Sequence, residues 1–160
     1  MTPHRRPQLR YRLAGMVKFA ELFETPGFRF GEVISPPVRE TEEGLEFTVP
    51  YSVHSPEAQQ FIERSYRLGW VLQDFDWMAW SGSAEARQLQ DDPSATLASA
   101  GPEQLAMLLT SLIRGDRFSE TTLVEAFNSG LLTAIVKRMA ALLNDASTAK
   151  NTQRRKPAAS

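Results

Sequence analysis

Cysteine is absent from the 160 residues of the chain. Without a thiol, the chain cannot form disulfides, thiolate zinc sites, iron–sulfur clusters or a cysteine nucleophile. The absence also fits a reducing compartment. No apolar run is long enough to span a membrane, and the basic N-terminus lacks the apolar region and cleavage site of a signal peptide. We therefore predict a cytoplasmic protein.

Catalytic and cofactor-binding motifs are also missing. The sequence has no glycine-rich phosphate loop, no H-E-x-x-H, no G-x-S-x-G and no carboxylate spacing typical of a two-metal nuclease. Histidine, the usual proton-transfer residue near neutral pH, occurs only as His4 and His54. The sequence thus predicts no metal and no cofactor, and it favours a protein without catalytic activity.

Charge is unevenly distributed along the chain. Residues 1–18 and 150–160 hold nine of the 18 basic residues and no acid, so that nine bases face all 19 acids in residues 19–149. Basic ends on an acidic body could contact a polyanion such as nucleic acid. The simpler interpretation is that they are solvated tails, because the body itself would repel phosphates. We expect residues 1–7 and 147–160 to be disordered and residues 8–146 to form one domain.

Apolar residues at helical spacing predict about six helices. The first is expected over residues 8–24. Another begins at Ser55-Pro56, where a capping hydroxyl precedes a proline at the first helical position. Helices in the last third are expected to begin at Pro102 and at Ser119, and a final helix carries an apolar stripe over residues 132–143.

Two segments predict strands. Residues 28–34 predict a short strand that ends at Ser35-Pro36-Pro37, and residues 45–51 alternate strictly, with Leu45, Phe47, Val49 and Tyr51 on one face. Pro50 places the second run at a sheet edge or a strand end. A lone two-stranded ribbon is marginal, so the hairpin is expected to pack on helices or to pair with a second copy of the chain. The predicted fold class is α+β, a mostly helical bundle with one docked antiparallel hairpin, and we predict self-association, with a homodimer as its simplest form.

The segment richest in aromatics places Asp76 beside Trp77 and Trp80. Two indoles with a carboxylate could stack a ring or a cation. The alternative, which we favour, is that the indoles fill the core while Asp76 caps a helix that begins at Trp77.

A polar turn between two apolar helices carries Arg114, Asp116 and Arg117. These side chains could form a recognition patch. We favour a salt-bridged turn, in which Gly115 ends one helix and Ser119 caps the next.

Two further arrangements would give the protein a different function. Ala126 and Gly130 have the spacing of a helix-turn-helix motif, but the helix that follows offers bases only Thr133, Lys137 and Arg138, so two core helices are the favoured interpretation. His54 would support a hydrolase if Asp74 or Asp76 converged with it in one pocket. A lone histidine in a loop is more often a surface residue.

Residues 51–58, 75–80 and 116–135 resemble a bacterial family catalogued as domain of unknown function 6508. The matching stretches read Tyr51-Ser-Val-His-Ser-Pro-Glu-Ala, Phe75-Asp-Trp-Met-Ala-Trp80 and Asp116-Arg-Phe-Ser-Glu-x-x-Leu-x-x-Ala-Phe-x-x-Gly-Leu-Leu-x-x-Ile. The resemblance covers about residues 10–143 and is clearest over residues 116–135. It implies a bacterial intracellular protein and brings no known activity.

The sequence therefore predicts a non-enzymatic binding or protein-interaction module with a protein partner or a small ligand. The alternatives are a nucleic-acid-binding protein, acting through the basic ends or the Ala126–Gly130 segment, and a hydrolase that uses His54. The candidate contact residues are Asp76, Trp77, Trp80, Arg114, Asp116 and Arg117.

Overall fold

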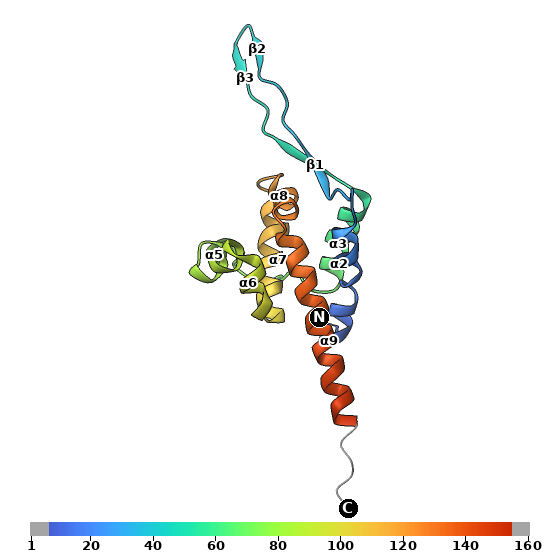
Figure 1. Ribbon diagram of the computed structural model, residues 1–160. Helices are drawn as coiled ribbons and strands as arrows, with labels where there is room; N and C mark the ends of the chain where they lie inside the picture. The colour runs from blue at the N-terminus through green and yellow to red at the C-terminus, as the bar shows by residue number, and fades with distance from the viewer. Residues whose placement is uncertain (1–6, 155–160) are drawn as a thin grey trace, which may run out of the picture.

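A computed structural model describes residues 7–154 of the chain, and it is helical apart from two small antiparallel sheets of two strands each (Figure 1). The predicted α+β class is confirmed. Residues 1–6 and 155–160, which belong to the two predicted basic tails, lie outside the described residues.

In chain order the elements are α1 (Leu9–Ala14), α2 (Lys18–Glu24), β1 (Gly31–Ile34), β2 (Arg39–Thr41), β3 (Gly44–Glu46), β4 (Tyr51–His54), α3 (Pro56–Arg67), α4 (Trp77–Ser81), α5 (Ala84–Asp91), α6 (Pro93–Thr96), the 3₁₀ turn η1 (Leu97–Ser99), α7 (Pro102–Asp116), α8 (Thr122–Asn128) and α9 (Leu131–Arg154).

The helices pack around α9, which runs the length of the helical body (Figure 1). Helices α1, α2 and α8 contact it, as do α6 and η1. The fully buried side chains come from all parts of the body, the largest being Trp70, Phe19, Phe30 and Phe61. Helix α9 continues to Arg154, into the segment predicted to be the C-terminal tail.

No single helix within residues 7–154 has both the length and the apolar character needed to cross a bilayer. Helices α8 and α9 pass that test of length and composition only when taken together, and they are bent by 70° at their junction.

The first predicted helix is broken in two, and Gly15 marks the break. A Cβ at this position would collide with Cδ1 of Leu68, which is itself buried. Any larger residue here would require the Leu68 side chain to shift, a constraint that apolar periodicity cannot reveal.

Arg12 ties α1 to the end of α3, a role that no local sequence pattern indicates. Its side chain is only 5% exposed. The guanidinium donates to the carbonyl oxygens of Leu68 (2.9 Å) and Gly69 (3.0 Å) and stacks on the ring of Trp70, while the Trp70 indole N–H donates to the carbonyl of Arg12 (3.1 Å). Two carbonyls just beyond the end of α3 are thus satisfied by a side chain distant in sequence.

The predicted hairpin is present, but its pairing is interrupted. Strand β1 pairs with β4, with Gly31 opposite His54, and β2 pairs with β3, with Arg39 opposite Glu46. We call residues 31–54 the β-arm. The prediction of a continuous strand over residues 45–51 is wrong, because residues 47–50 lie in neither ladder. Pro36 and Pro37 on the facing segment and Pro50 on this one lack the N–H that a ladder needs.

The base of the β-arm is docked on the helices, and the rest projects away from them (Figure 1). Strand β1 contacts α8, and β4 contacts α3. Phe30 is 1% exposed and packs against the rings of Phe61 and Phe127. Gly31 allows β1 to lie close to β4 and to α8. A Cβ at this position would lie 2.6 Å from the carbonyl oxygen of Val53 in β4 and 3.0 Å from the side chain of Val124 in α8. The expected docking therefore applies to the root of the arm alone.

Candidate functional site

The projecting part of the β-arm carries an unusual amount of exposed apolar surface. Eleven large apolar side chains are exposed in the part of the chain that the structure describes, and six of them belong to the arm: Val33, Val38, Leu45, Phe47, Val49 and Val53. Phe47 and Val49 are 71% and 78% exposed. Contiguous apolar surface of this kind marks interaction sites in soluble proteins.

The large apolar residues of the arm recur at every second position from 45 to 53, which is the period of an extended strand. Alternate side chains of such a strand lie on the same side. We call Leu45, Phe47, Val49, Tyr51 and Val53 the apolar stripe. Tyr51 is half-buried, and the other four are exposed. Burial does not follow this alternation, because residues 45–50 are all exposed, so the helices of the chain cover neither side of this part of the arm.

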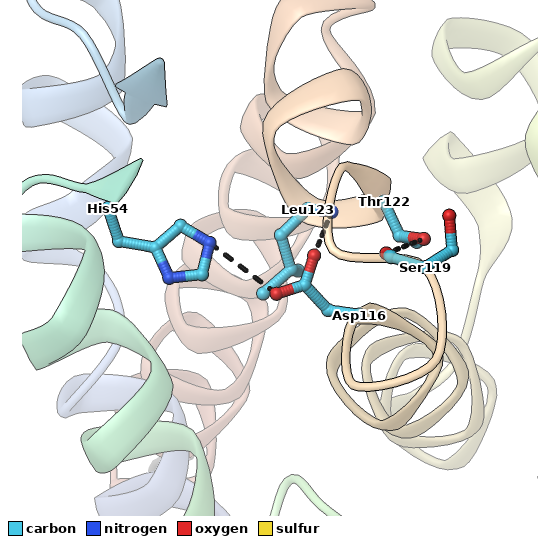
Figure 2. Close-up of polar contacts among 5 residues, drawn as sticks. All are labelled: His54, Asp116, Ser119, Thr122 and Leu123. Atoms are coloured by element: carbon cyan, nitrogen blue, oxygen red, sulfur yellow. Dashed lines mark hydrogen bonds and ion pairs between the residues drawn. The ribbon is translucent and has the colours of Figure 1, made fainter. Parts of the chain in front are cut away.

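His54 and Asp116 meet at the root of the β-arm (Figure 2). The Nε2 atom of His54, at the end of β4, lies 3.4 Å from Oδ2 of Asp116, at the end of α7. Both side chains are less than one-fifth exposed. Within the described residues Nε2 makes no hydrogen bond, so the contact is electrostatic. It connects the arm to the turn between α7 and α8.

Asp116 also accepts a hydrogen bond from the first turn of helix α8. Its Oδ1 accepts a hydrogen bond from the backbone N–H of Leu123 at 3.0 Å (Figure 2). Burial raises the pKa of this carboxyl above 3.8, and the Leu123 hydrogen bond and the nearby His54 oppose that rise. The prediction that Ser119 caps the helix is wrong: α8 begins at Thr122, and Ser119 instead uses its carbonyl to accept from the Thr122 hydroxyl. Asp116 lies seven residues before Leu123 in the sequence, so no local capping motif predicts this hydrogen bond.

The two carboxylates considered for a hydrolase have other surroundings. Asp76 caps α4 by accepting from the backbone N–H of Ala79, as predicted. Asp74 is exposed and lines a hollow of about 680 Å³ with Tyr66 and Glu103. The carboxylate paired with His54 is that of Asp116.

Ser52 lies on the same side of β4 as His54, and its hydroxyl is buried without a hydrogen-bond partner among the described residues. The hollows that the structure outlines near Asp74, beside α9 and at the tip of the arm are lined by other residues. No three histidine or acidic side chains come together as a metal site within residues 7–154.

The two tryptophans predicted to share a site have different neighbours. Trp80 is half-buried, packs against the core and contacts the ring of Phe75, with 6.1 Å between centroids. Trp77 instead lies against Phe118 in the α7–α8 turn, at 5.8 Å. Phe118 is 75% exposed. The favoured interpretation, core packing, describes Trp80, whereas Trp77 belongs to a surface pair.

The structure therefore joins two candidate sites that are far apart in the sequence. Phe118 belongs to the polar turn, which also contains Arg114, half-buried, and Arg117, exposed. In the described residues Asp116 forms the one ion pair of this turn, and its partner is His54. The turn therefore combines an exposed aromatic pair with two arginines close in sequence to Phe118.

The segment that resembles a helix-turn-helix uses its polar side chains within the body. Gly130 has a φ of +87° at the junction of α8 and α9. Thr133, Lys137 and Arg138 line a groove of about 570 Å³ that faces α6 and η1. Lys137 pairs with Glu24 at 2.7 Å, and Arg138 donates to the carbonyl of Ala100 at 2.9 Å. A recognition helix would leave such side chains free to contact bases, whereas here Lys137, although 59% exposed, and Arg138 are both paired within the chain.

The fold and these surfaces define an α+β protein with a helical body, a projecting β-arm and an aromatic surface beside the root of the arm. Comparison with known families places it: residues 8–145 match the model of a family of unknown function (DUF6508), and the chain belongs to this family. The resemblance over about residues 10–143 is thereby confirmed. No curated protein and no solved structure matches the chain.

Proposed function

We propose that the protein is a non-enzymatic protein-interaction module whose main binding surface is the apolar stripe of the β-arm. The observation that carries this proposal is the exposure of Phe47 and Val49 at alternate positions of one extended segment. A strand whose apolar face remains in water loses the stabilisation of about 25 cal/mol per Å² that burial would provide. Covering this face with another protein restores it.

The rigid root of the arm supports a binding role. Phe30, Gly31 and the His54–Asp116 pair fix where the arm leaves the body. A fixed origin reduces the conformational entropy that the arm loses on binding. The absence of a catalytic motif in the sequence, together with an imidazole–carboxylate pair engaged in joining two elements, favours binding over catalysis.

The test uses a matched pair of variants. Val49→Glu places a charge within the stripe, whereas Thr48→Glu places the same charge on the adjacent exposed residue, outside the stripe. Tagged wild-type protein and both variants are used to capture partners from an extract of the source cells. We expect the wild type and Thr48→Glu to retain the same partners and Val49→Glu to lose them. Equal capture by both variants would refute the role of the stripe.

The Trp77–Phe118 surface is a second candidate contact. Phe118 is 75% exposed although it is aromatic, and Arg117 beside it is exposed as well. Aromatic and arginine side chains are enriched where interfaces gain most of their energy. Here the partner is a protein or a small ligand, and Phe118→Ala should weaken its capture without changing the stability of the free chain by more than about 0.5 kcal/mol.

We place the protein in the cytoplasm of a bacterium. The lack of cysteine fits a reducing compartment, and the family resemblance pointed to bacteria. Nucleic-acid binding remains the alternative function, and steep salt dependence of binding to duplex DNA is its signature.

A further inference from the structure

The apolar stripe is symmetric about its central residue. On either side of Val49 the order is aromatic then aliphatic, with Phe47 and Leu45 toward the tip and Tyr51 and Val53 toward the root. If a second stripe runs antiparallel over the first, Val49 meets Val49, Phe47 meets Tyr51 and Leu45 meets Val53. Every aromatic ring then faces a ring and every aliphatic side chain faces another, as a twofold contact requires.

From this symmetry we infer that the stripe is covered by a second copy of the same chain, with the two β-arms packed face to face and antiparallel about Val49. The inference rests on the proposed binding role of the arm and names its partner. It also names the surface and the direction of packing for the homodimer that the sequence predicted.

Charge at the tip of the arm favours the antiparallel direction. The distal turn carries Glu42 and Glu43, and the adjoining strand β2 carries Glu40 and Arg39, the latter opposite Glu46. In a parallel pair the two acidic tips would lie side by side and repel each other. In the antiparallel pair each tip lies at the root of the other arm, so the two tips are separated by the length of the paired arms.

The shape of the molecule allows this arrangement. The arm extends well beyond the helices (Figure 1), so antiparallel arms place the two helical bodies at opposite ends. Residues 47–50 belong to no strand ladder within one chain, so cross-strand pairing does not hold the middle of the stripe and it can adapt to its partner. Two opposed stripes bury on the order of 1,000 Å², near the lower limit of specific protein interfaces. We therefore expect a weak dimer that dissociates on dilution.

The first measurement is the oligomeric state of the purified full chain over a series of concentrations, by light scattering or sedimentation. We expect the apparent mass of the wild type and of Thr48→Glu to rise toward that of a dimer, and Val49→Glu to remain a monomer throughout. The variants should have the same circular dichroism spectrum, because Thr48 and Val49 are both exposed.

The second measurement tests the direction of packing. Because the chain has no cysteine, Thr48→Cys and Glu43→Cys each accept one spin label, outside the stripe. At about 3.3 Å per residue, the antiparallel arrangement separates the two labels along the arms by about 7 Å at position 48 and about 40 Å at position 43. Parallel arms would give similar, short separations at both positions. Adding Val49→Glu to either labelled chain should abolish the dipolar coupling.

The inference is refuted if the purified wild type remains a monomer, if Val49→Glu dimerises as Thr48→Glu does, or if the label separations at positions 43 and 48 are equal. These results leave the proposed function standing when capture from the extract still depends on Val49, since the partner is then another protein. If capture does not depend on Val49 either, both proposals fail.

Discussion

The helical body and the β-arm use the same apolar residue types with opposite results. In the body, Phe61 and Trp70 are fully buried, whereas in the arm Phe47 is 71% exposed. Both regions have regular apolar periodicity, of helical period in one and of strand period in the other. The body satisfies its pattern within one chain, and the arm does not. The difference indicates that periodicity specifies which face must be covered but not which molecule covers it.

The largest expected effect separates these two regions directly. Phe61→Ala removes a ring that contacts Phe19, Phe23 and Phe30, and we expect it to lower the free energy of unfolding by about 3–5 kcal/mol. Phe47→Ala should change that of the monomer by less than about 0.5 kcal/mol. Urea denaturation of dilute protein measures both. A loss for Phe47→Ala comparable to that for Phe61→Ala would mean that the arm packs on its own body in solution.

The second largest loss of stability is expected when the buried guanidinium of Arg12 is removed. Arg12→Met keeps the apolar stem but leaves the carbonyls of Leu68 and Gly69 without their donors, and we expect a loss of about 2–4 kcal/mol. Arg10→Met, on the exposed side of the same helix, is the control and should change stability by less than about 0.5 kcal/mol. Similar values for the two variants would show that the guanidinium does not hold α1 to the end of α3.

The junction of arm and body is sensitive to a single methyl group. Gly31→Ala introduces a Cβ 2.6 Å from a backbone oxygen and 3.0 Å from Val124, and we expect it to cost about 1–3 kcal/mol as β1 moves off α8. Gly82→Ala is the matched control, since its Cβ finds nothing closer than 3.7 Å and its φ is −84°. Denaturation curves in which both alanine variants match the wild type would contradict the close approach at the root.

The smallest effect concerns the ion pair of the junction. The folded state raises the pKa of Asp116 above its unfolded value, so the folded state binds the proton more tightly. The contribution of Asp116 to stability is therefore fully present below about pH 4 and is lost as the pH rises through the raised pKa. Asp116→Asn keeps an acceptor for Leu123 and removes this titration.

We expect Asp116→Asn to differ from the wild type by less than about 1 kcal/mol at pH 7, because solvent screening limits such pairs. Relative to the wild type, the variant should gain stability between about pH 4 and the raised pKa. Thermal unfolding across this range measures the difference. A wild-type advantage that grows with rising pH would show that the ion pair with His54 outweighs the burial of the carboxylate.

Local signals predicted much of the body. Ser55 caps α3 by accepting from Ala58, and Asp76 caps α4, each through a hydrogen bond to a near neighbour along the chain. Such caps are readable because donor and acceptor are close in sequence. The break at Gly15 and the role of Arg12 were not predicted, since each depends on the end of α3, a distant part of the chain.

The candidate contact residues divide in the same way. Asp76 behaves as its local pattern predicted. Trp77 and Trp80 were both expected to fill the core, with a shared binding site as the alternative, but α4 is a single short turn, and Trp80 packs on the core while Trp77 lies against Phe118. The pairing of His54 with Asp116 joins two distant parts of the chain and has no local signature.

By itself the sequence determined the α+β class, most of the helices and their caps, and the alternation of apolar residues in the arm, because each of these depends on neighbours within a few positions along the chain. Only the tertiary structure decided that Arg12 is buried, that Asp116 faces His54, and that the apolar stripe lies beyond the reach of its own helices. Those outcomes depend on which distant segments come together, and a stripe of apolar side chains has the same pattern whether its own chain covers it or another does.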